Sequence, residues 1–255
     1  MISKLRITVV LAVGTVLIAG CNTVETVTFS PSAHQSAIVR DGIPAIVSQQ
    51  KQSIVLVSPS GRGEPANGRV AFTVAIDNLT NSPLNVAVSD IQIAQTLSDG
   101  TEVALRAIPY DQLVTEEKQK EVAMALLTGL AAGANAYSAA RAGYGNVNGI
   151  VYTPHGAAHY SGTYYSPTAA AVAQANANFQ NEAMIQNTIA TGQKNMTLLD
   201  RMILKDNTVM PHEWIGGRVI ISAPISEPGK IKSYNIRIKV GNDWHSIDVS
   251  QHRRS

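Results

Sequence analysis

The sequence predicts an α+β protein in which a long hairpin of two helices interrupts an antiparallel β-sandwich. Apolar and polar residues alternate within 37–109 and again within 206–250, with turn signals between the alternating runs. Half-buried strands have this pattern. The residues between them, 110–205, lack the alternation and form two long stretches typical of helices. The economical interpretation is one sandwich whose chain leaves for the hairpin and then returns.

The N-terminus has the pattern of a secretory signal peptide. Lys4 and Arg6 precede an uncharged apolar run, 7–18, which ends in small residues. A basic start, a short apolar segment and a small-residue cleavage site define such a peptide. The run is too short for a membrane span, which needs about 20 apolar residues. We therefore expect residues 1–20 to be removed.

Residues 18–21, IAGC, end in Cys21, the single cysteine of the chain. This stretch resembles the lipobox of bacterial lipoproteins, which implies that the Cys21 thiol is diacylated and that the new amine is acylated after cleavage. Two or three acyl chains make attachment to a bilayer lasting, whereas an ordinary buried thiol is the alternative. The resemblance also implies, through Asn22, sorting to the outer membrane. No cysteine is left for a disulfide.

The charge balance argues against nucleic acid as a partner. Removal of the signal peptide takes away two basic residues and no acid, which leaves 18 basic and 18 acidic residues. Binding to phosphates needs clustered Lys and Arg, and the only such cluster is Arg253-Arg254 at the C-terminus, which we interpret as a solvated tail.

The first block follows a polar segment, 21–36, which we interpret as a lipidated tether. A β-branched strand is predicted at 53–57, and residues 62–68 are a loop by composition. Residues 69–78 predict a half-buried strand, because every second residue is apolar; these residues are Val70, Phe72, Val74 and Ile76. Further strands are predicted within 84–93 and at 101–108.

The last block contains strands predicted at 218–222, 233–240 and 244–249. Its stretch "PHEWIGGRVIISAP", together with "FTVAIDNLTNSPLNV" from the first block, resembles the late and early strands of immunoglobulin-like domains in secreted bacterial lipoproteins. The resemblance implies an immunoglobulin-like sandwich, from which the helical insertion is a departure.

Within the insertion, a helix is predicted to begin at a cap, either Asp111 or Thr115, and to run to about Ala140. The segment 142–167 is rich in Gly and Tyr, has no charged side chain, and is predicted to be a long loop. A second helix is predicted from about Pro167 to Leu204. One face of it carries a narrow apolar stripe, made of Ile185, Ile189, Met196, Leu199 and Ile203.

The first helix contains 19 uncharged residues, 122–140, with Gly129 and Gly133 in a small-xxx-small pair. Such a pair lets helix backbones approach closely. We expect a helix-contact surface here. Its partner stays open between the second helix, another copy of the chain and a membrane.

Five of the eight tyrosines fall within 22 residues of the predicted loop. Tyrosine offers contact area and a hydrogen-bonding group at little entropic cost, so these residues are candidates for recognition, or else pegs that hold the loop to the helices. They are Tyr144, Tyr152, Tyr160, Tyr164 and Tyr165.

The histidines predict no metal site. His155 and His159 have a ligand spacing only if they lie on one helical turn, yet they fall in a predicted loop with no nearby third ligand. We interpret His212 and Glu213, beside Trp214, as residues at a strand entrance. No nucleophile elbow, phosphate loop or zinc-protease motif is present, and we expect no cofactor.

The sequence thus predicts a lipid-anchored, non-catalytic envelope protein that binds another envelope protein or itself through the hairpin. The alternative is an enzyme or ligand-binding protein acting on cell-wall glycans, with a cleft between sandwich and hairpin. The alternative predicts convergent carboxylates in that cleft.

Overall fold

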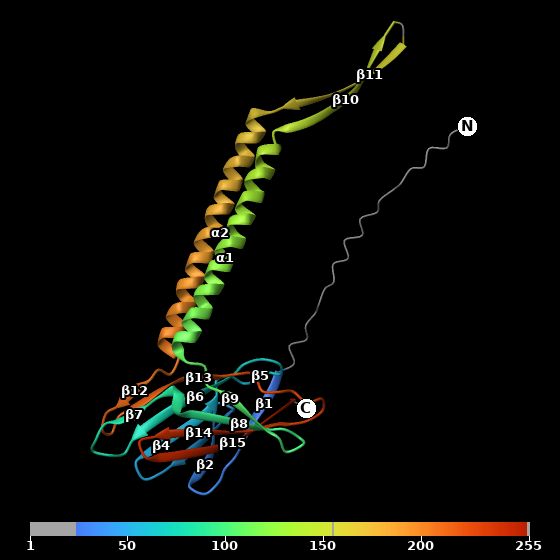
Figure 1. Cartoon of the computed structure of the whole chain (residues 1–255). Helices are drawn as coiled ribbons and strands as arrows, with labels where there is room; N and C mark the ends of the chain where they lie inside the picture. Colours follow the sequence, from blue (N-terminus) through green and yellow to red (C-terminus); the bar gives the residue numbers. More distant parts are fainter. Residues whose placement is uncertain (1–23, 155, 254–255) are drawn as a thin grey trace.

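The computed structural model describes residues 24–154 and 156–253, and it is an α+β protein (Figure 1). Antiparallel sheets form a domain at the base, and two long helices rise from it as a hairpin with a small two-stranded β-hairpin at the far end. The predicted signal peptide, Cys21 and Asn22 lie outside the described residues.

Two antiparallel sheets make up the base, which we call the sheet domain. The six-stranded sheet has the order β5 (Glu64–Pro65), β1 (Val24–Ser30), β15 (Asp243–Arg253), β14 (Lys232–Val240), β8 (Ile91–Thr96) and β9 (Glu102–Arg106). The five-stranded sheet has the order β13 (Trp214–Ile221), β6 (Val70–Asn78), β4 (Ser53–Pro59), β3 (Ile43–Gln49) and β2 (Gln35–Arg40). A short ladder joins β7 (Leu84–Val86) to β12 (Asn207–Val209), and a 3-10 turn spans Val88–Asp90.

One apolar core lies between the two sheets, and the alternating sequence pattern produces it. Strand β6 buries every second residue, as predicted, and β14 does the same. The ring of Phe72 from β6 meets that of Tyr234 from β14 edge to face, with centroids 6.1 Å apart. Burial raises the pKa of the Tyr234 phenol. The two sheets are therefore held by side chains that meet across one shared interior.

A buried polar network crosses the same interior. The His245 ring on β15 lies between two hydroxyls, with Nδ1 3.0 Å from Ser48 Oγ and Nε2 2.9 Å from Ser53 Oγ. Ser53 also donates to Asp243 Oδ2 at 3.1 Å. His245, Ser48 and Ser53 have no exposed surface. Burial lowers the pKa of His245 to about 4, against the opposing pull of the Asp243 carboxylate.

The prediction of a tether through residue 36 is wrong from Val24 onward. Residues 24–30 form β1, which pairs with β15 near the other end of the chain, and β2 begins at Gln35. At the start of β1 the Glu25 carboxylate forms a buried ion pair with Lys232 Nζ, 2.6 Å away. Only Asn22 and Thr23 therefore separate Cys21 from the first residue of the folded sheet.

The helical hairpin consists of α1 (Tyr110–Arg141) and α2 (Pro167–Met202), close to the predicted ranges. Neither Asp111 nor Thr115 caps α1. Pro109 precedes the helix without a side-chain cap, and the Thr115 hydroxyl donates to the Asp111 carbonyl inside it. Helix α2 is capped by Ser166, whose hydroxyl accepts from the Ala169 amide.

The loop predicted at 142–167 is instead a β-hairpin. Strands β10 (Tyr144–Thr153) and β11 (Gly156–Tyr165) pair along their full length, from Tyr144 opposite Tyr165 to Thr153 opposite Gly156. It extends the helices rather than folding back onto them (Figure 1).

The pKa of His245 predicts an acid-sensitive step in stability. A histidine in the unfolded chain has a pKa near 6.5, so between pH 6.5 and 4 the unfolded state binds more protons than the folded state. Lowering the pH through this range should therefore decrease the free energy of unfolding, by roughly 3 kcal/mol in total. Urea unfolding across this range should show the fall, and His245→Gln should flatten it. Glu64, whose pKa burial raises, acts in the opposite direction, so the difference between the two proteins is the quantity to compare. Equal slopes would contradict the assignment.

The buried ion pair at the start of β1 makes a second prediction. Lys232→Met leaves the Glu25 carboxylate buried without its cation, which should lower the free energy of unfolding by about 3–5 kcal/mol. Adding Glu25→Gln removes the stranded charge and should restore part of the loss. Urea denaturation of the three proteins at pH 7 measures both effects. A single variant as stable as the double variant would refute the pairing.

Candidate interaction site along the helical hairpin

The base of the hairpin is fixed to one strand of the sheet domain. The Ile108 amide, just before α1, donates to the Ile220 carbonyl at 2.8 Å, and the Leu204 amide, just after α2, donates to the Arg218 carbonyl at 2.9 Å. Both acceptors lie on β13. Gly217, the residue before Arg218 on the same strand, has no room for a side chain, because a Cβ there would lie 2.6 Å from the Leu204 nitrogen. The chain therefore enters and leaves the hairpin on two residues of β13 that are two positions apart.

Side chains reinforce this attachment. Ile108, Leu113 and Ile203 form a small buried cluster of their own beneath the helices. On the outside, the Arg69 guanidinium, from the loop before β6, makes a two-pronged ion pair with Glu116 of α1, one N–O distance being 2.9 Å. Hydrogen bonds from Arg69, and then from Gln112, lower the pKa of Glu116 to about 2. A planar two-pronged pair fixes orientation as well as contact.

Polar side chains meet between the two helices, along what we call the seam. Thr128 and Thr188 hydroxyls lie 2.9 Å apart. Further along the helices, Asn135 Nδ2 donates to Asn181 Oδ1 at 3.0 Å, and Asn181 Nδ2 donates to the Ala132 carbonyl at 3.2 Å. These residues are partly buried by the partner helix. Helices of water-soluble hairpins usually turn an apolar stripe of large side chains to each other. In this hairpin the buried apolar residues away from the base are small, Ala139 and Ala177.

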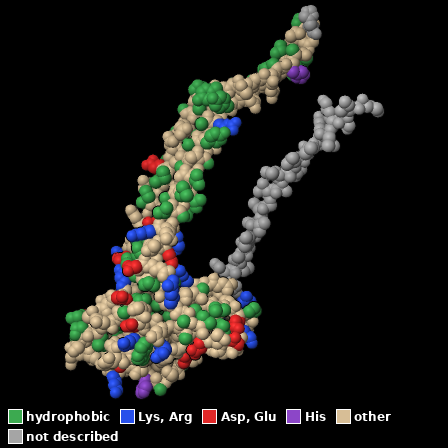
Figure 2. All heavy atoms as spheres, in the orientation of Figure 1, with side chains coloured by type: hydrophobic (Ala, Val, Ile, Leu, Met, Phe, Trp, Pro, Cys, Tyr) green, Lys and Arg blue, Asp and Glu red, His purple; other side chains and the backbone are tan. Residues whose placement is uncertain are grey.

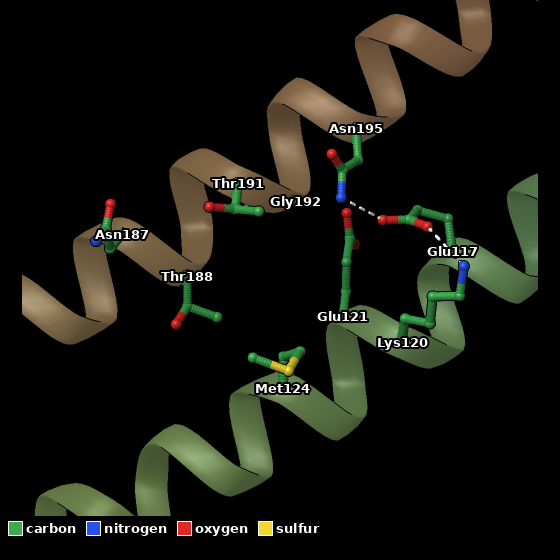
Figure 3. Close-up of a pocket in the computed structure, with 9 residues that line it drawn as sticks. All are labelled: Glu117, Lys120, Glu121, Met124, Asn187, Thr188, Thr191, Gly192 and Asn195. Carbon is green, nitrogen blue, oxygen red and sulfur yellow. Dashed lines mark hydrogen bonds and ion pairs between the residues drawn. The ribbon is translucent and has the colours of Figure 1, made fainter. Parts of the chain in front are cut away.

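Near the base the seam opens into a groove of about 430 Å³, drawn in Figure 3. Glu117 accepts a hydrogen bond from Asn195 Nδ2 at 2.7 Å and lies 3.4 Å from Lys120 Nζ. Glu121 points across the groove toward Gly192, whose missing side chain leaves room for the carboxylate. Two carboxylates thus lie in one groove, but it runs between α1 and α2 and not between the sheet domain and the hairpin.

Apolar side chains lie on the outer surface of the hairpin, where water-soluble helices carry their polar residues. Leu126 and Leu130 of α1 are each 65% exposed, and Phe179 of α2 is 75% exposed. Charged side chains gather at the base, and the hairpin above it is mostly apolar or uncharged (Figure 2). The other exposed apolar side chains of the two helices include Val122, Met124, Leu127, Tyr137, Val172, Ile185, Ile189 and Leu198.

Gly129 and Gly133 belong to this outer surface. Nothing lies within 4 Å of a Cβ built on either residue, so they do not pack against α2. Gly133 lies two residues before the seam residue Asn135, and Leu126 lies two residues before Thr128. Two residues correspond to a rotation of about 200° around the helix, which places Gly133 and Leu126 on the side away from the seam. The intramolecular alternative for the glycine pair is therefore excluded, and its contact surface faces away from the molecule.

Helix α1 meets the length and composition of a membrane span. It is 32 residues long, has a window of mean hydropathy 1.3, and only 6% of that window is buried. The apolar stripe predicted on α2 is buried only toward the base. Ile203 is buried there and Leu199 packs against the same cluster, whereas Ile185 and Ile189 are 45% and 49% exposed.

The Gly- and Tyr-rich segment forms strands because its tyrosines lie across its glycines. Tyr164 is paired with Gly145 and Tyr160 with Gly149, and each ring fills the space that a side chain on the facing glycine would need. Covering a glycine with an aromatic ring from the next strand stabilises a pair of strands. All five candidate recognition tyrosines are exposed, Tyr152 most of all, at 81%. None holds this segment against the sides of the helices, since the β-hairpin extends beyond them.

The histidines are not brought together with other ligands. His155 lies outside the described residues, and His159 is exposed on β11. Within 24–154 and 156–253, no three His, Cys, Asp or Glu side chains are grouped as metal ligands. His212 lies in the turn before β13, and its Nε2 is 3.1 Å from Asn81 Oδ1. Trp214 begins β13, which is an edge strand of its sheet.

Comparisons with known proteins found no matching family model, no matching curated protein and no matching solved structure. The interaction site is therefore defined by its own geometry: a hairpin with a polar seam and an apolar outer surface, fixed to β13.

Two glycine substitutions that should change stability in opposite directions test this geometry. Gly217→Ala places a methyl group against the Leu204 backbone and should destabilise the protein by about 1–3 kcal/mol. Gly129→Ala meets empty space inside a helix and should stabilise α1 by up to about 1 kcal/mol. Hydrogen exchange of α1 amides in the isolated protein measures the second effect, and chemical unfolding the first. A destabilising Gly129→Ala would show that this position is covered.

Proposed function

We propose that the protein is an envelope lipoprotein, anchored through acylated Cys21 in the outer membrane, whose helical hairpin has a non-catalytic binding or assembly role. The observation that supports the role most directly is the inverted distribution of side chains. The hairpin satisfies its polar groups inside the seam and presents Leu126, Leu130 and Phe179 to its surroundings. An exposed apolar surface of this extent marks an interaction site.

The sheet domain serves in this proposal as the rigid base of the hairpin. We further propose that its two sheets form an immunoglobulin-like sandwich, which the resemblance of the early and late strands supports. The exposed tyrosines of the β-hairpin, Tyr152 in particular, would add a second contact surface at the far end.

The alternative, a glycan-directed enzyme or binding protein, has one observation in its favour. Glu117 and Glu121 line one groove. Glu117 is already paired with Asn195 and Lys120, which favours a structural role for it. Binding of cell-wall fragments that is lost in Glu117→Gln/Glu121→Gln would support the alternative instead.

The anchor is tested by replacing its only thiol. The parent protein, expressed in a bacterial host with labelled fatty acid, should carry the label and sediment with membranes. Cys21→Ser should lose the label, because no other thiol is present. An unlabelled parent that retains its start methionine would refute the anchor.

The interaction role is tested by photo-crosslinking in intact cells. A photoreactive residue replacing Leu126 should form a defined crosslinked product, with a protein or with a membrane lipid, since this position is 65% exposed on the apolar surface. Ser36, exposed on the edge strand β2, provides the matched control and should give none. Equal products at both positions, or none at Leu126, would count against the hairpin as the interacting part.

A further inference from the structure

We propose that the helical hairpin crosses the bilayer to which Cys21 is anchored, with α1 against the acyl chains and the β-hairpin on the far side. This inference rests on the lipid anchor of the proposed function and names the partner of the hairpin as the membrane itself. Four observations carry it: the position of the anchor, the length of the uncharged stretch, the polar seam, and the composition of the β-hairpin.

The anchor and the hairpin leave the sheet domain on the same side. The segment around β5, residues 63–69, connects them. A side chain at Gly63 would collide with Val24, and Lys232 binds both Glu25 and the Ala66 carbonyl. Arg69 pairs with Glu116 of α1. Figure 1 shows β1 beginning at the upper edge from which the helices rise. The three residues from Cys21 to Val24 span at most about 11 Å. A bilayer holding the acyl chains of Cys21 therefore lies against the edge from which the helices project.

The uncharged part of α1 has the length and height that this bilayer requires. The helix rises about 18 Å from Tyr110 to Val122, through a charged segment outside the hydrocarbon. This height is close to the reach of the link to Cys21, at most about 11 Å, plus a headgroup layer of about 5–8 Å. Residues 122–140 then rise about 28 Å without a charge, close to the hydrocarbon thickness of about 30 Å. Arg141 follows at the far boundary, with the Tyr144 and Tyr165 rings 4.9 Å apart just beyond it. Aromatic side chains favour such boundaries.

In the seam, polar groups that would be costly to expose to lipid form hydrogen bonds with each other. Thr128 with Thr188, and Asn135 with Asn181, satisfy each other at the height of the uncharged stretch. Hydrogen bonds of this kind, together with small residues, hold helices together in membranes. The surface left outside on α1 is apolar.

The side chains of helix α2 determine which side of the hairpin faces lipid. Its outer surface mixes Phe179 and Ile189 with Asn178, Gln186 and Glu182. A carboxylate near the middle of a bilayer turns toward protein or water. Helix α1 is therefore the lipid-facing one, and α2 turns toward a wet or protein-covered side.

The composition of the β-hairpin fits a segment that has been transferred across the bilayer. Residues 142–167 contain no Asp, Glu, Lys or Arg, so transfer through the bilayer moves no full charge. Its strands make no ladder with the sheet domain, and its side chains are exposed to solvent on both faces.

Thiol labelling of the full-length protein in its native membrane tests the crossing. Leu130→Cys, Ser161→Cys and Ser36→Cys place a single free thiol in the middle of α1, in the β-hairpin and on the sheet domain, because acylation occupies Cys21. With a membrane-impermeant maleimide, Ser36→Cys and Ser161→Cys should react from opposite sides. Leu130→Cys should react at least about tenfold more slowly than either until detergent is added, since a thiolate does not form in hydrocarbon.

The parent protein separates failure of the anchor from failure of the crossing. If the parent itself takes up maleimide, Cys21 is not acylated and the proposed function fails. If the parent is unreactive but Ser36→Cys and Ser161→Cys react from the same side, the anchor stands and the crossing is refuted. Protection of Leu130→Cys without any bilayer, in a protein that sediments as an oligomer, would assign this surface to a second copy and also refute the crossing.

A charge placed at two heights on α1 gives a second test. Leu130→Lys and Gln119→Lys both add one cation at an exposed position, but only the first lies within the uncharged stretch. In the Ser161→Cys background, Leu130→Lys should move the label to the same side as the sheet domain, and Gln119→Lys should leave it unchanged. Circular dichroism of both proteins checks that the helices remain. An unchanged label in Leu130→Lys would overturn the proposal.

Discussion

The pairing of polar side chains between α1 and α2 is the constraint on which the rest of the hairpin depends. Because Thr128 meets Thr188 and Asn135 meets Asn181, the apolar residues of both helices are left on the outside. Apolar burial between the helices is therefore small, and water-soluble helices gain most of their stability from such burial. This is why the proposed function assigns part of the stability of the hairpin to what surrounds it.

The attachment to the sheet domain compensates for the weak seam at one end. The chain bonds to β13 on the way in and on the way out, with a small buried cluster of Ile108, Leu113 and Ile203 beneath the helices. The two-pronged ion pair between Arg69 and Glu116 also fixes the orientation of α1 relative to the loop before β6. The sheet domain, with its shared core and buried polar network, is thus a base that holds the hairpin at a fixed angle.

The sequence predicted the parts of this fold that depend on local periodicity, such as the buried alternation of β6 and the extents of α1 and α2. It failed where the deciding contact was distant or unusual. Residues 24–30 form a strand because β15 pairs with them, and the segment 142–167 forms strands because Tyr160 and Tyr164 cover facing glycines. The apolar stripe of α2 is buried at its base end, at Leu199 and Ile203, and exposed at Ile185 and Ile189. Periodicity identifies a face of a helix but not what that face contacts.

Charge is arranged by height along the molecule, and this arrangement limits what can surround each level. The base of the hairpin carries its lysines and all its acids except Glu182 of α2, the middle of α1 carries no charge, and the β-hairpin carries none either. A hairpin that merely extended into water would need charge along its whole length to remain soluble. The absence of charge on α1 between Glu121 and Arg141, on a helix whose apolar side chains are exposed, fits the proposed apolar environment that begins at a defined height. The short link from Cys21 to Val24 places the proposed anchor at the lower boundary of that environment, so one bilayer satisfies both.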